Sequence, residues 1–207
     1  MSHTHQYNFK GQGPTTQSYR KLWLEHFKDG TFKKASPLEW RVFSRLLFGC
    51  DYFTYQCEIT QSEIAADCGT HRTTIPKTGQ GLTKLSLIVS QNKITRAGKQ
   101  PNRYILTTPA SNTDQTQEVI YAGEVMANEE VDINITSKAV VPAHVRLPQE
   151  LFDNGYFASL DRDHCTWKIY CCLLYRADFK TGYCFPSIKQ ISEDTGIGCR
   201  TINKSLN

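Results

Sequence analysis

The chain has 207 residues, of which 39% are hydrophobic and 21% are charged, and its formal net charge is +4 at pH 7. This composition is typical of a soluble globular protein, and the length suits two small domains. Because no apolar run reaches the roughly 18–20 residues of a membrane helix, and residues 1–17 lack the basic and apolar parts of a secretory signal, we expect a cytoplasmic protein with no membrane partner.

The charge divides the chain into three parts. Residues 1–106 carry a net charge of +8, residues 107–137 carry −6 and residues 138–207 carry +2. Basic charge confined to one part favours a polyanionic partner, although a solvated basic surface would give the same count. We predict a flexible N-terminus over 1–18, a first domain over 19–106, an acidic linker over 107–137 and a second domain over 138–207.

A helix is predicted to begin after Ser36. Ser36 is a favoured N-cap, Pro37 suits the first helical position, and Glu39 completes a capping box. Trp40 is expected in the core. Apolar residues recur at spacings of three and four along the same helix: Leu38, Val42, Phe43, Leu46 and Leu47. The next segment, CDYFTYQCEI, predicts a turn and a short strand.

Residues 59–75, ITQSEIAADCGTHRTTI, predict two short helices joined by a tight turn. The first starts near Thr60 and ends at Gly69, where a left-handed backbone is favoured. Ala65 and Ala66 are small enough to let a second helix cross closely, and Ile75 anchors that helix in the core. The exposed start of the second helix holds donor-rich side chains of the kind that contact base edges and phosphates in a DNA major groove: Arg72, Thr73 and Thr74.

The second helix of this motif contains residues that disfavour a regular helix. An interior proline costs about 3 kcal/mol and an interior glycine about 1 kcal/mol. Pro76, Gly79 and Gly81 therefore predict a helix that either kinks or starts late, at Pro76. Phosphate contact by this helix is expected, whereas the pattern leaves base-specific recognition by this copy open.

A basic hairpin is predicted after this helix. The apolar runs 87–89 and 104–106 are typical of two strands, and Gly98 and Pro101 mark the turn between them. Its tip carries the side chains expected to contact DNA: Arg96, Lys99, Asn102 and Arg103. A helix-turn-helix followed by such a hairpin is a winged helix, whose wing would lie against the phosphate backbone or the minor groove. The alternative is a hairpin that its charges merely keep soluble.

The acidic part begins with TTPASNTDQTQ, which is typical of a linker, and contains the strand-like run VDINIT. We expect this linker to keep the two domains apart or to recruit host replication proteins. A role as a mimic of DNA, or as a tail for another partner, is the alternative.

The last part of the chain repeats the first. With a shift of 127 residues, identical pairs align without gaps over about forty positions, which implies two copies of one fold. The aligned pairs include Trp40 with Trp167, Asp51 with Asp178, Cys57 with Cys184, Asp67 with Asp194, Gly69 with Gly196, Thr74 with Thr201, and Lys77 with Lys204.

The second copy has its own helical pattern. Asp161 or Asp163 would cap its first helix, whose apolar positions are Trp167, Ile169, Tyr170, Leu173 and Leu174. The turn segment ADFKTGYCFP and the motif SIKQISEDTGIGCRTI follow. The chain stops at Asn207, inside the second recognition helix and before any wing. We therefore expect an incomplete domain that is unstable or forms a homodimer through its uncovered core.

Two segments carry a resemblance to known families. The first copy, through YRKLWLEHF, LEWRVFSRLLFGCDY, ITQSEIAADCGTHRTTI and LTKLSLI, resembles the winged-helix domain of plasmid and phage replication initiators of the RepL-like type. The run FPSIKQISEDTGIGCRTINKSL resembles the helix-turn-helix shared by phage replisome organisers and bacterial regulators. The resemblance implies a mainly α fold with small β-hairpin wings, arranged as two tandem winged-helix domains. It is specific for this fold and less so for replication, because transcription regulators use the same module.

The sequence offers little support for catalysis. No nucleophile–base pair, phosphate-binding glycine loop or carboxylate cluster is evident, so we expect no enzymatic activity, no cofactor and no metal. Eight cysteines occur without a CxxC pair, and they are most simply small buried hydrophobes. A thiol- or metal-sensing switch is the alternative, because Cys50, Cys57 and Cys68 could converge in space, as could Cys165, Cys171 and Cys172.

We therefore expect sequence-specific binding of double-stranded DNA, with origin binding by a plasmid or phage replication initiator as the leading role. A transcriptional regulator with the same DNA chemistry is the first alternative. A protein-interaction module with degenerate winged helices is the second. The residues expected to contact DNA are Gln61, Arg72, Thr73, Thr74, Lys77, Lys84, Arg96, Lys99, Asn102, Arg103, Ser187, Arg200, Thr201, Asn203 and Lys204.

Overall fold

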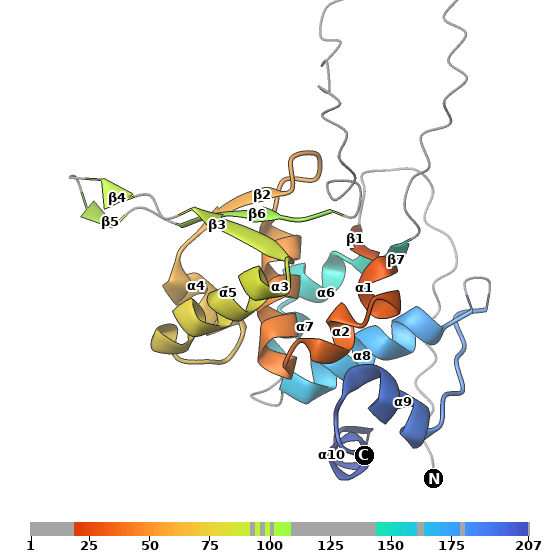
Figure 1. Cartoon of the computed structure of the whole chain (residues 1–207). Coiled ribbons are helices and arrows are strands. Elements are labelled where there is room, and N and C mark those ends of the chain that lie inside the picture. Colours follow the sequence, from red (N-terminus) through yellow and green to blue (C-terminus); the bar gives the residue numbers. More distant parts are fainter. Residues whose placement is uncertain are drawn as a thin grey trace, which may run out of the picture.

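The computed structural model describes residues 19–91, 94–95, 98–99, 102–108, 144–160, 164–178 and 181–206. Over these residues the protein is mainly helical and has small antiparallel sheets, as predicted (Figure 1). None of the helices in this part of the chain combines the length and the apolar character needed to span a membrane.

The first copy runs from a short strand through a helical core to a small sheet. Its elements are β1 (Tyr19–Trp23), α1 (Glu25–Lys28), α2 (Thr31–Lys34), α3 (Pro37–Gly49), β2 (Gln56–Ile59), α4 (Gln61–Asp67), the 3-10 turn η1 (Arg72–Thr74), α5 (Ile75–Lys84), β3 (Ile88–Gln91), β4 (Ile94–Thr95), β5 (Gly98–Lys99) and β6 (Asn102–Leu106). Strands β2, β6 and β3 form an antiparallel sheet in that order, and β4 pairs with β5. The predicted pairing of the two apolar runs is confirmed, because Ile88 lies opposite Leu106.

The second copy repeats the helical succession. Its elements are β7 (His144–Pro148), α6 (Glu150–Asp153), α7 (Tyr156–Ser159), α8 (His164–Arg176), α9 (Ile188–Thr195) and α10 (Cys199–Leu206). Residues 181–187 contain no strand, although the repeat aligns them with β2. Asp161 and Asp163, the predicted caps of α8, lie outside the described residues.

The two copies fold with the same local devices. Asp51 Oδ1 accepts from the Thr54 amide at 2.8 Å, and Asp178 Oδ1 accepts from the Thr181 amide at the same distance. Capping boxes start α4 at Thr60 and α9 at Ser187. Left-handed glycines follow both helices, with φ of 61° at Gly69 and 71° at Gly196. Because each device depends on residues a few positions apart, the repeated sequence specifies it twice.

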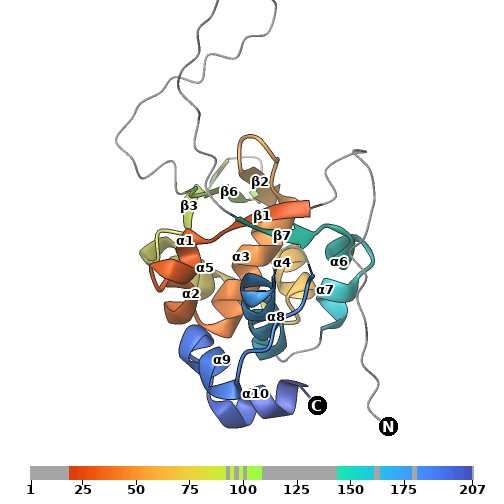
Figure 2. The ribbon, with the colours of Figure 1, turned by 90° about the vertical axis from the view of Figure 1, so that its right-hand side faces the viewer.

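The copies also pair with each other, through β1 and β7 (Figure 2). Tyr19 lies opposite Pro148 and Trp23 opposite His144, so Lys21 and Arg146 face each other at the centre. The expectation that the acidic linker keeps two domains apart is wrong, because this pairing joins the copies directly.

The helices of the two copies share one core. α3 packs on α8, α2 contacts α9, and α7 contacts α4. Trp40 and Trp167 are both fully buried, as predicted, and the Trp167 Nε1 donates to Ser44 Oγ at 2.8 Å. Ser44 in turn donates to the carbonyl of Trp40 at 2.9 Å. An unbroken hydrogen-bonded path therefore crosses the core from one copy to the other.

Two buried cations hold the copies together in a reciprocal way. Arg41 of α3 donates to the carbonyls of Leu160 at 2.7 Å and Phe157 at 2.8 Å, at the end of α7. Its equivalent in the repeat, Lys168 of α8, donates to the carbonyls of Ala35 at 2.5 Å and Thr195 at 2.7 Å. Each cation thus caps the C-terminal end of a short helix in the other copy, where unpaired carbonyls favour positive charge, and Lys168 also binds the end of α9 in its own copy.

The helices of the second copy are covered by this arrangement. Ile191, Ile197 and Ile202 are buried, and α9 contacts α2 of the first copy. Tyr183 and Phe185 are exposed and stack on each other, with ring centroids 6.4 Å apart. A homodimer is therefore not required to cover an open core, and it stays a prediction.

Candidate nucleic-acid interface

The stretch from Thr60 to Ile75 forms the two helices and the turn that the sequence predicts. Thr60 caps α4 and accepts from the Glu63 amide at 3.2 Å. The chain turns at Gly69, and the Thr70 amide returns to the Ala65 carbonyl at 2.9 Å. Ile75 is buried, as is Ala65, but Ala66 is exposed, so its predicted place at the helix crossing is wrong.

Pro76 does not kink the second helix. α5 begins at Ile75, which places Pro76 in the first turn, where a missing amide proton costs nothing. Of the two alternatives that the sequence left open, the late start is the one observed. The preceding residues form η1, whose first turn is capped by His71, with Nδ1 2.7 Å from Thr73 Oγ1.

Gly81 lets α5 approach α3. A Cβ at this position would lie 1.8 Å from Glu39 Oε1, and the same carboxylate holds the Ser36 amide at 2.7 Å in the capping box of α3. Glycine lowers the stability of a helix, but at this position it allows α5 to pack closely against the start of α3. That packing fixes the outward face of α5.

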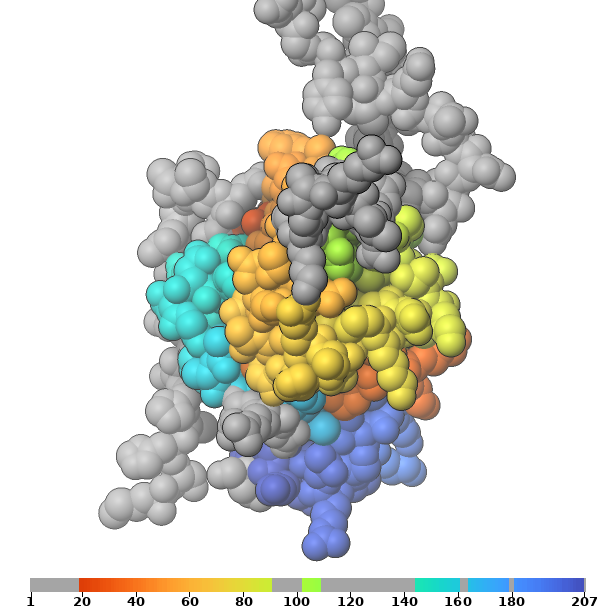
Figure 3. Space-filling model, turned by 90° about the vertical axis from the view of Figure 1, so that its left-hand side faces the viewer, coloured from red at the N-terminus to blue at the C-terminus, as the bar shows by residue number. Residues whose placement is uncertain are grey.

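The outward face of η1 and α5 is basic. Arg72, Thr73, Lys77 and Lys84 are exposed, and Thr74 is half-buried. Residues 68–113 contain seven Lys and Arg and no Asp or Glu. Figure 3 shows the molecule from the side on which α4 and α5 lie.

The two carboxylates of neighbouring α4 are already engaged. Glu63 accepts from the Thr60 amide and hydroxyl, and Asp67 accepts from Arg45 at 2.5 Å. Gln61, the first residue of α4, is half-buried. Asp67 is thus neutralised by Arg45, whereas Glu63 keeps its negative charge on α4, so the positive charge of this surface is carried by η1 and α5.

The structure ties part of the hairpin into the sheet. Arg103 is half-buried and donates to Gln56 of β2. Asn102 is half-buried too, and its amide lies 3.3 Å from the Tyr104 hydroxyl. These two residues stand at the base of the hairpin, closer to the sheet than predicted. Lys99 belongs to β5, but its side chain lies outside the described part of the chain, as does the whole of Arg96.

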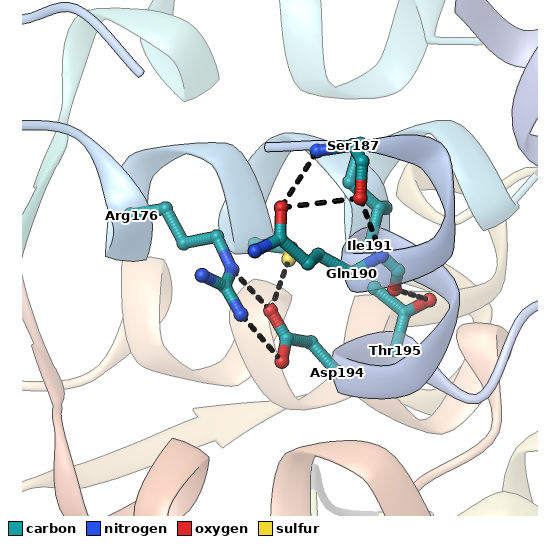
Figure 4. Close-up of polar contacts among 7 residues, drawn as sticks. Arg176, Ser187, Gln190, Ile191, Asp194 and Thr195 are labelled. Atoms are coloured by element: carbon teal, nitrogen blue, oxygen red, sulfur yellow. Dashed lines mark hydrogen bonds and ion pairs between the residues drawn. The ribbon is translucent and has the colours of Figure 1, made fainter. Parts of the chain in front are cut away.

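The second copy presents α10 in the place that α5 takes in the first copy. Arg200, Asn203 and Lys204 are exposed and Thr201 is half-buried. Ser187 is exposed, but its hydroxyl is used as the cap of α9 and accepts from the Gln190 amide at 3.2 Å. Arg176 of α8 holds Asp194 of α9 through a pair that includes a 3.0 Å bond (Figure 4). As in the first copy, the acidic side chain beside the exposed helix is neutralised by an arginine.

The two exposed helices both lie away from the strand pair of β1 and β7. In Figure 1, α5 and α10 lie at the left and at the bottom, and β1 and β7 lie at the upper right. The perpendicular view of Figure 3 has both α5 and the C-terminal helices on its near face. The predicted residues Arg72, Lys77, Lys84, Arg200 and Lys204 are thus carried by η1, α5 and α10, which lie away from that strand pair.

Sequence reasoning missed the two residues that fix this arrangement. Arg41 and Lys168 are charged residues within apolar helical patterns, and they occupy equivalent positions in the repeat. A charge at the same position of both copies, inside a predicted core helix, is the signal that could have identified them, because a buried cation needs polar partners from elsewhere in the chain.

The cysteines are mostly core residues, as predicted. Cys50, Cys57, Cys68, Cys171 and Cys172 are buried. Burial raises the pKa of the last four to about 12 and that of Cys50 to about 11. Thiols held in the protonated form are poor nucleophiles and poor metal ligands. In the described ranges, no group of three His, Cys, Asp or Glu side chains could hold a metal ion.

We expect Cys199 to be the fastest-reacting thiol of the native protein, because it is exposed at the first position of α10. Labelling with a disulfide reagent should modify Cys199 first and the five buried cysteines only at the rate of unfolding. A Cys199→Ser variant is the control and should lack the fast phase. Rapid modification of the buried thiols in native protein would instead favour a thiol switch.

Comparison of the chain with protein-family models, with curated proteins and with solved structures found no match. The function therefore has to be argued from the geometry and charge of the chain itself.

Proposed function

We propose that this protein binds double-stranded DNA in a sequence-specific manner, without catalysis, through two tandem winged-helix modules. In the first module α4, η1 and α5 are the helix-turn-helix, and the hairpin between β3 and β6 is the wing. In the second module α9 and α10 are the helix-turn-helix. The role we propose is origin binding by a plasmid or phage replication initiator in the cytoplasm.

One observation carries the proposal. A stretch with seven cations and no carboxylate forms both the exposed helix that follows a tight turn and the strands of the adjacent hairpin. A solvated surface needs charge for solubility, but that need is met equally well by mixed signs. A single sign on the two elements that a winged helix applies to DNA is what phosphate binding requires.

The exposed side chains suggest a division of tasks. Lys77 and Lys84 are single cations on α5, suited to phosphate contacts that position the protein and release counterions. Arg72 and Thr73 stand at the start of η1, where helix-turn-helix proteins contact base edges. Arg200 and Thr201 stand at the start of α10 and would do the same in the second copy.

The two alternatives are a transcriptional regulator and a protein-interaction module, and different observations separate each of them from a replication initiator. A transcriptional regulator would use the same DNA chemistry, and it would bind a promoter site and leave replication unchanged. The interaction module rested on two features, Pro76 as a sign of a degenerate recognition helix and the missing wing of the second copy. Since Pro76 lies in the first turn of α5, where proline is tolerated, the first of these loses its support, and the missing second wing is what still favours the module.

We expect binding to random duplex to fall steeply between about 50 and 200 mM salt, as for other proteins that neutralise several phosphates. Replacing Lys84 by Ala should lower the slope of log K against log salt by about 1, because one phosphate contact is lost. Fluorescence anisotropy with a labelled duplex measures both quantities.

Lys28→Ala is the matched control, because Lys28 is exposed on α1, which belongs neither to the proposed helix-turn-helix nor to the wing. It should leave the slope unchanged. Flat or absent binding across the salt range would sink the DNA proposal and favour the interaction module. For the replication role, loss of plasmid maintenance in a variant that no longer binds DNA is the deciding observation, and a bound promoter with unaffected replication would favour the regulator.

A further inference from the structure

We infer that the two recognition helices form an inverted pair of unequal units, so that the DNA site consists of two different half-sites in opposite orientations. This inference rests on the proposed function and deepens it. The inference concerns the relative orientation of the two half-sites that one chain binds on one duplex. It follows from the symmetry of the contacts between the copies.

The first support is the register of β1 and β7. Before α3 and α8 the copies match at a shift of 125 residues, as Leu22 with Leu147 shows, so Tyr19 is equivalent to His144 and Lys21 to Arg146. Lys21 and Arg146, the third residues of their strands, lie opposite each other. Tyr19 pairs with Pro148, and the equivalent residues of the other copy, His144 and Trp23, pair with each other in the same way. An antiparallel pair centred on equivalent residues has a twofold axis there.

The second support lies in the core. Arg41 of copy one binds the end of α7, and its equivalent Lys168 of copy two binds the end of α2. The aromatic partners are exchanged in the same way, because Arg41 lies 5.2 Å from the Phe157 ring and Lys168 lies 5.1 Å from the Phe32 ring. Contacts of α7 with α4 are likewise matched by contacts of α2 with α9.

The same twofold relation therefore governs the strands, the core and the helix-turn-helix units. Both recognition helices lie away from β1 and β7 (Figure 1). An axis that passes from the strand pair through the core and out between α5 and α10 would meet a bound duplex at one of its own twofold axes. Helices related in this way contact half-sites of opposite orientation, whereas a direct repeat would require copies related by translation along the DNA.

The two units cannot recognise the same half-site. The repeat aligns Arg72 with Cys199 and Thr73 with Arg200, so the arginine moves by one position. One residue rotates a side chain by about 100° around a helix. The backbone differs as well, since residues 72–74 form a 3-10 turn whereas 199–201 open α10. The site should therefore be inverted in geometry and unequal in sequence.

Selection of duplexes from a random library with the full chain, followed by binding of synthetic duplexes to unaltered protein, tests this inference. We expect the selected site to have two distinct halves about one helical turn apart. Reversing one half to make a direct repeat should weaken binding at least tenfold, as should inserting five base pairs between the halves. Arg72→Ala should relax base preference in one half, and Arg200→Ala in the other.

Two outcomes would overturn the inference while leaving the proposed function intact. One is a selected site made of direct repeats, and the other is a single half-site whose affinity equals that of the full site. Failure to select any duplex would remove the proposed function itself. Because the orientation test changes the DNA and not the protein, a variant that fails to fold cannot confuse its result.

Discussion

Replacing Arg41 by Met is expected to destabilise the protein by about 2–5 kcal/mol, since each buried carbonyl that loses its donor costs about 1–3 kcal/mol. Arg41 has no exposed surface and holds two carbonyls at the end of α7. Methionine approximates the apolar part of the side chain but donates no hydrogen bond. Lys168→Met should have a similar effect, because Lys168 is 1% exposed and donates to the carbonyls of Ala35 and Thr195. Small domains are stable by only about 5–15 kcal/mol, so either loss would be large.

Urea unfolding followed by circular dichroism measures this effect. Lys189→Met is the matched control, because Lys189 is exposed on α9, and a surface substitution of this kind changes stability by about 0.5 kcal/mol or less. Each cation caps a helix of the other copy, so a single transition should unfold both copies in the parent and in the variants. Equal stability of Arg41→Met and the control, or two separate transitions in the parent, would contradict a shared core.

The pH dependence of the difference between parent and Lys168→Met gives a second measure. Burial lowers the pKa of Lys168 from its ordinary 10.5 to about 8. Between these values the unfolded chain binds more protons than the folded one, so the contribution of Lys168 to stability rises with pH. The parent should therefore gain stability relative to the variant from about pH 8 to 10.5. A difference in the free energy of unfolding that stays constant over this range would show that folding does not lower the pKa of Lys168.

Local features of the fold could be predicted because their causes lie a few residues apart. The capping boxes at Ser36, Thr60 and Ser187 each join a hydroxyl to a residue three positions later. The turn at Gly69 needs one residue that tolerates a left-handed backbone. Pro76 was ambiguous, because its cost depends on whether the helix starts before or after Thr74. The sequence of the helix alone does not decide that point.

The association of the copies could not be predicted in the same way, because it rests on partners more than a hundred residues apart. Arg41 and the Leu160 carbonyl are separated by 119 positions. The repeat itself contained an overlooked signal: Leu22, Gly30 and Phe32 align with Leu147, Gly155 and Phe157 at a shift of 125, not 127. A difference of two residues before α8 hides this match from an ungapped alignment. The exposed positions of the candidate site, such as Lys77 and Lys84, followed from helical periodicity, but the placement of α5 relative to α10 did not.

The double variant Arg72→Ala, Arg200→Ala is expected to weaken binding of a selected duplex by about 2–6 kcal/mol, which is roughly 30-fold to 10⁴-fold. An arginine that contacts a guanine contributes about 1–3 kcal/mol of discrimination, so each single variant should lose about half of this free energy. Both arginines are exposed at the starts of their helices, and the variants should therefore unfold at the same urea concentration as the parent. Binding to random duplex should fall much less, because the lysines on α5 and α10 supply the phosphate contacts.

The single variants show whether both helices engage one duplex at once. Arg72 and Arg200 belong to different copies, on η1 and α10, so their effects should add if one duplex contacts both helices. If only the first copy bound DNA, Arg200→Ala would leave affinity for the selected duplex unchanged, and the double variant would match Arg72→Ala. Lys28→Ala, which removes the same charge from α1, should preserve binding. Equal losses in Lys28→Ala and the single variants would mean that the protein responds to net charge alone, and sequence-specific recognition by η1 and α10 would be refuted.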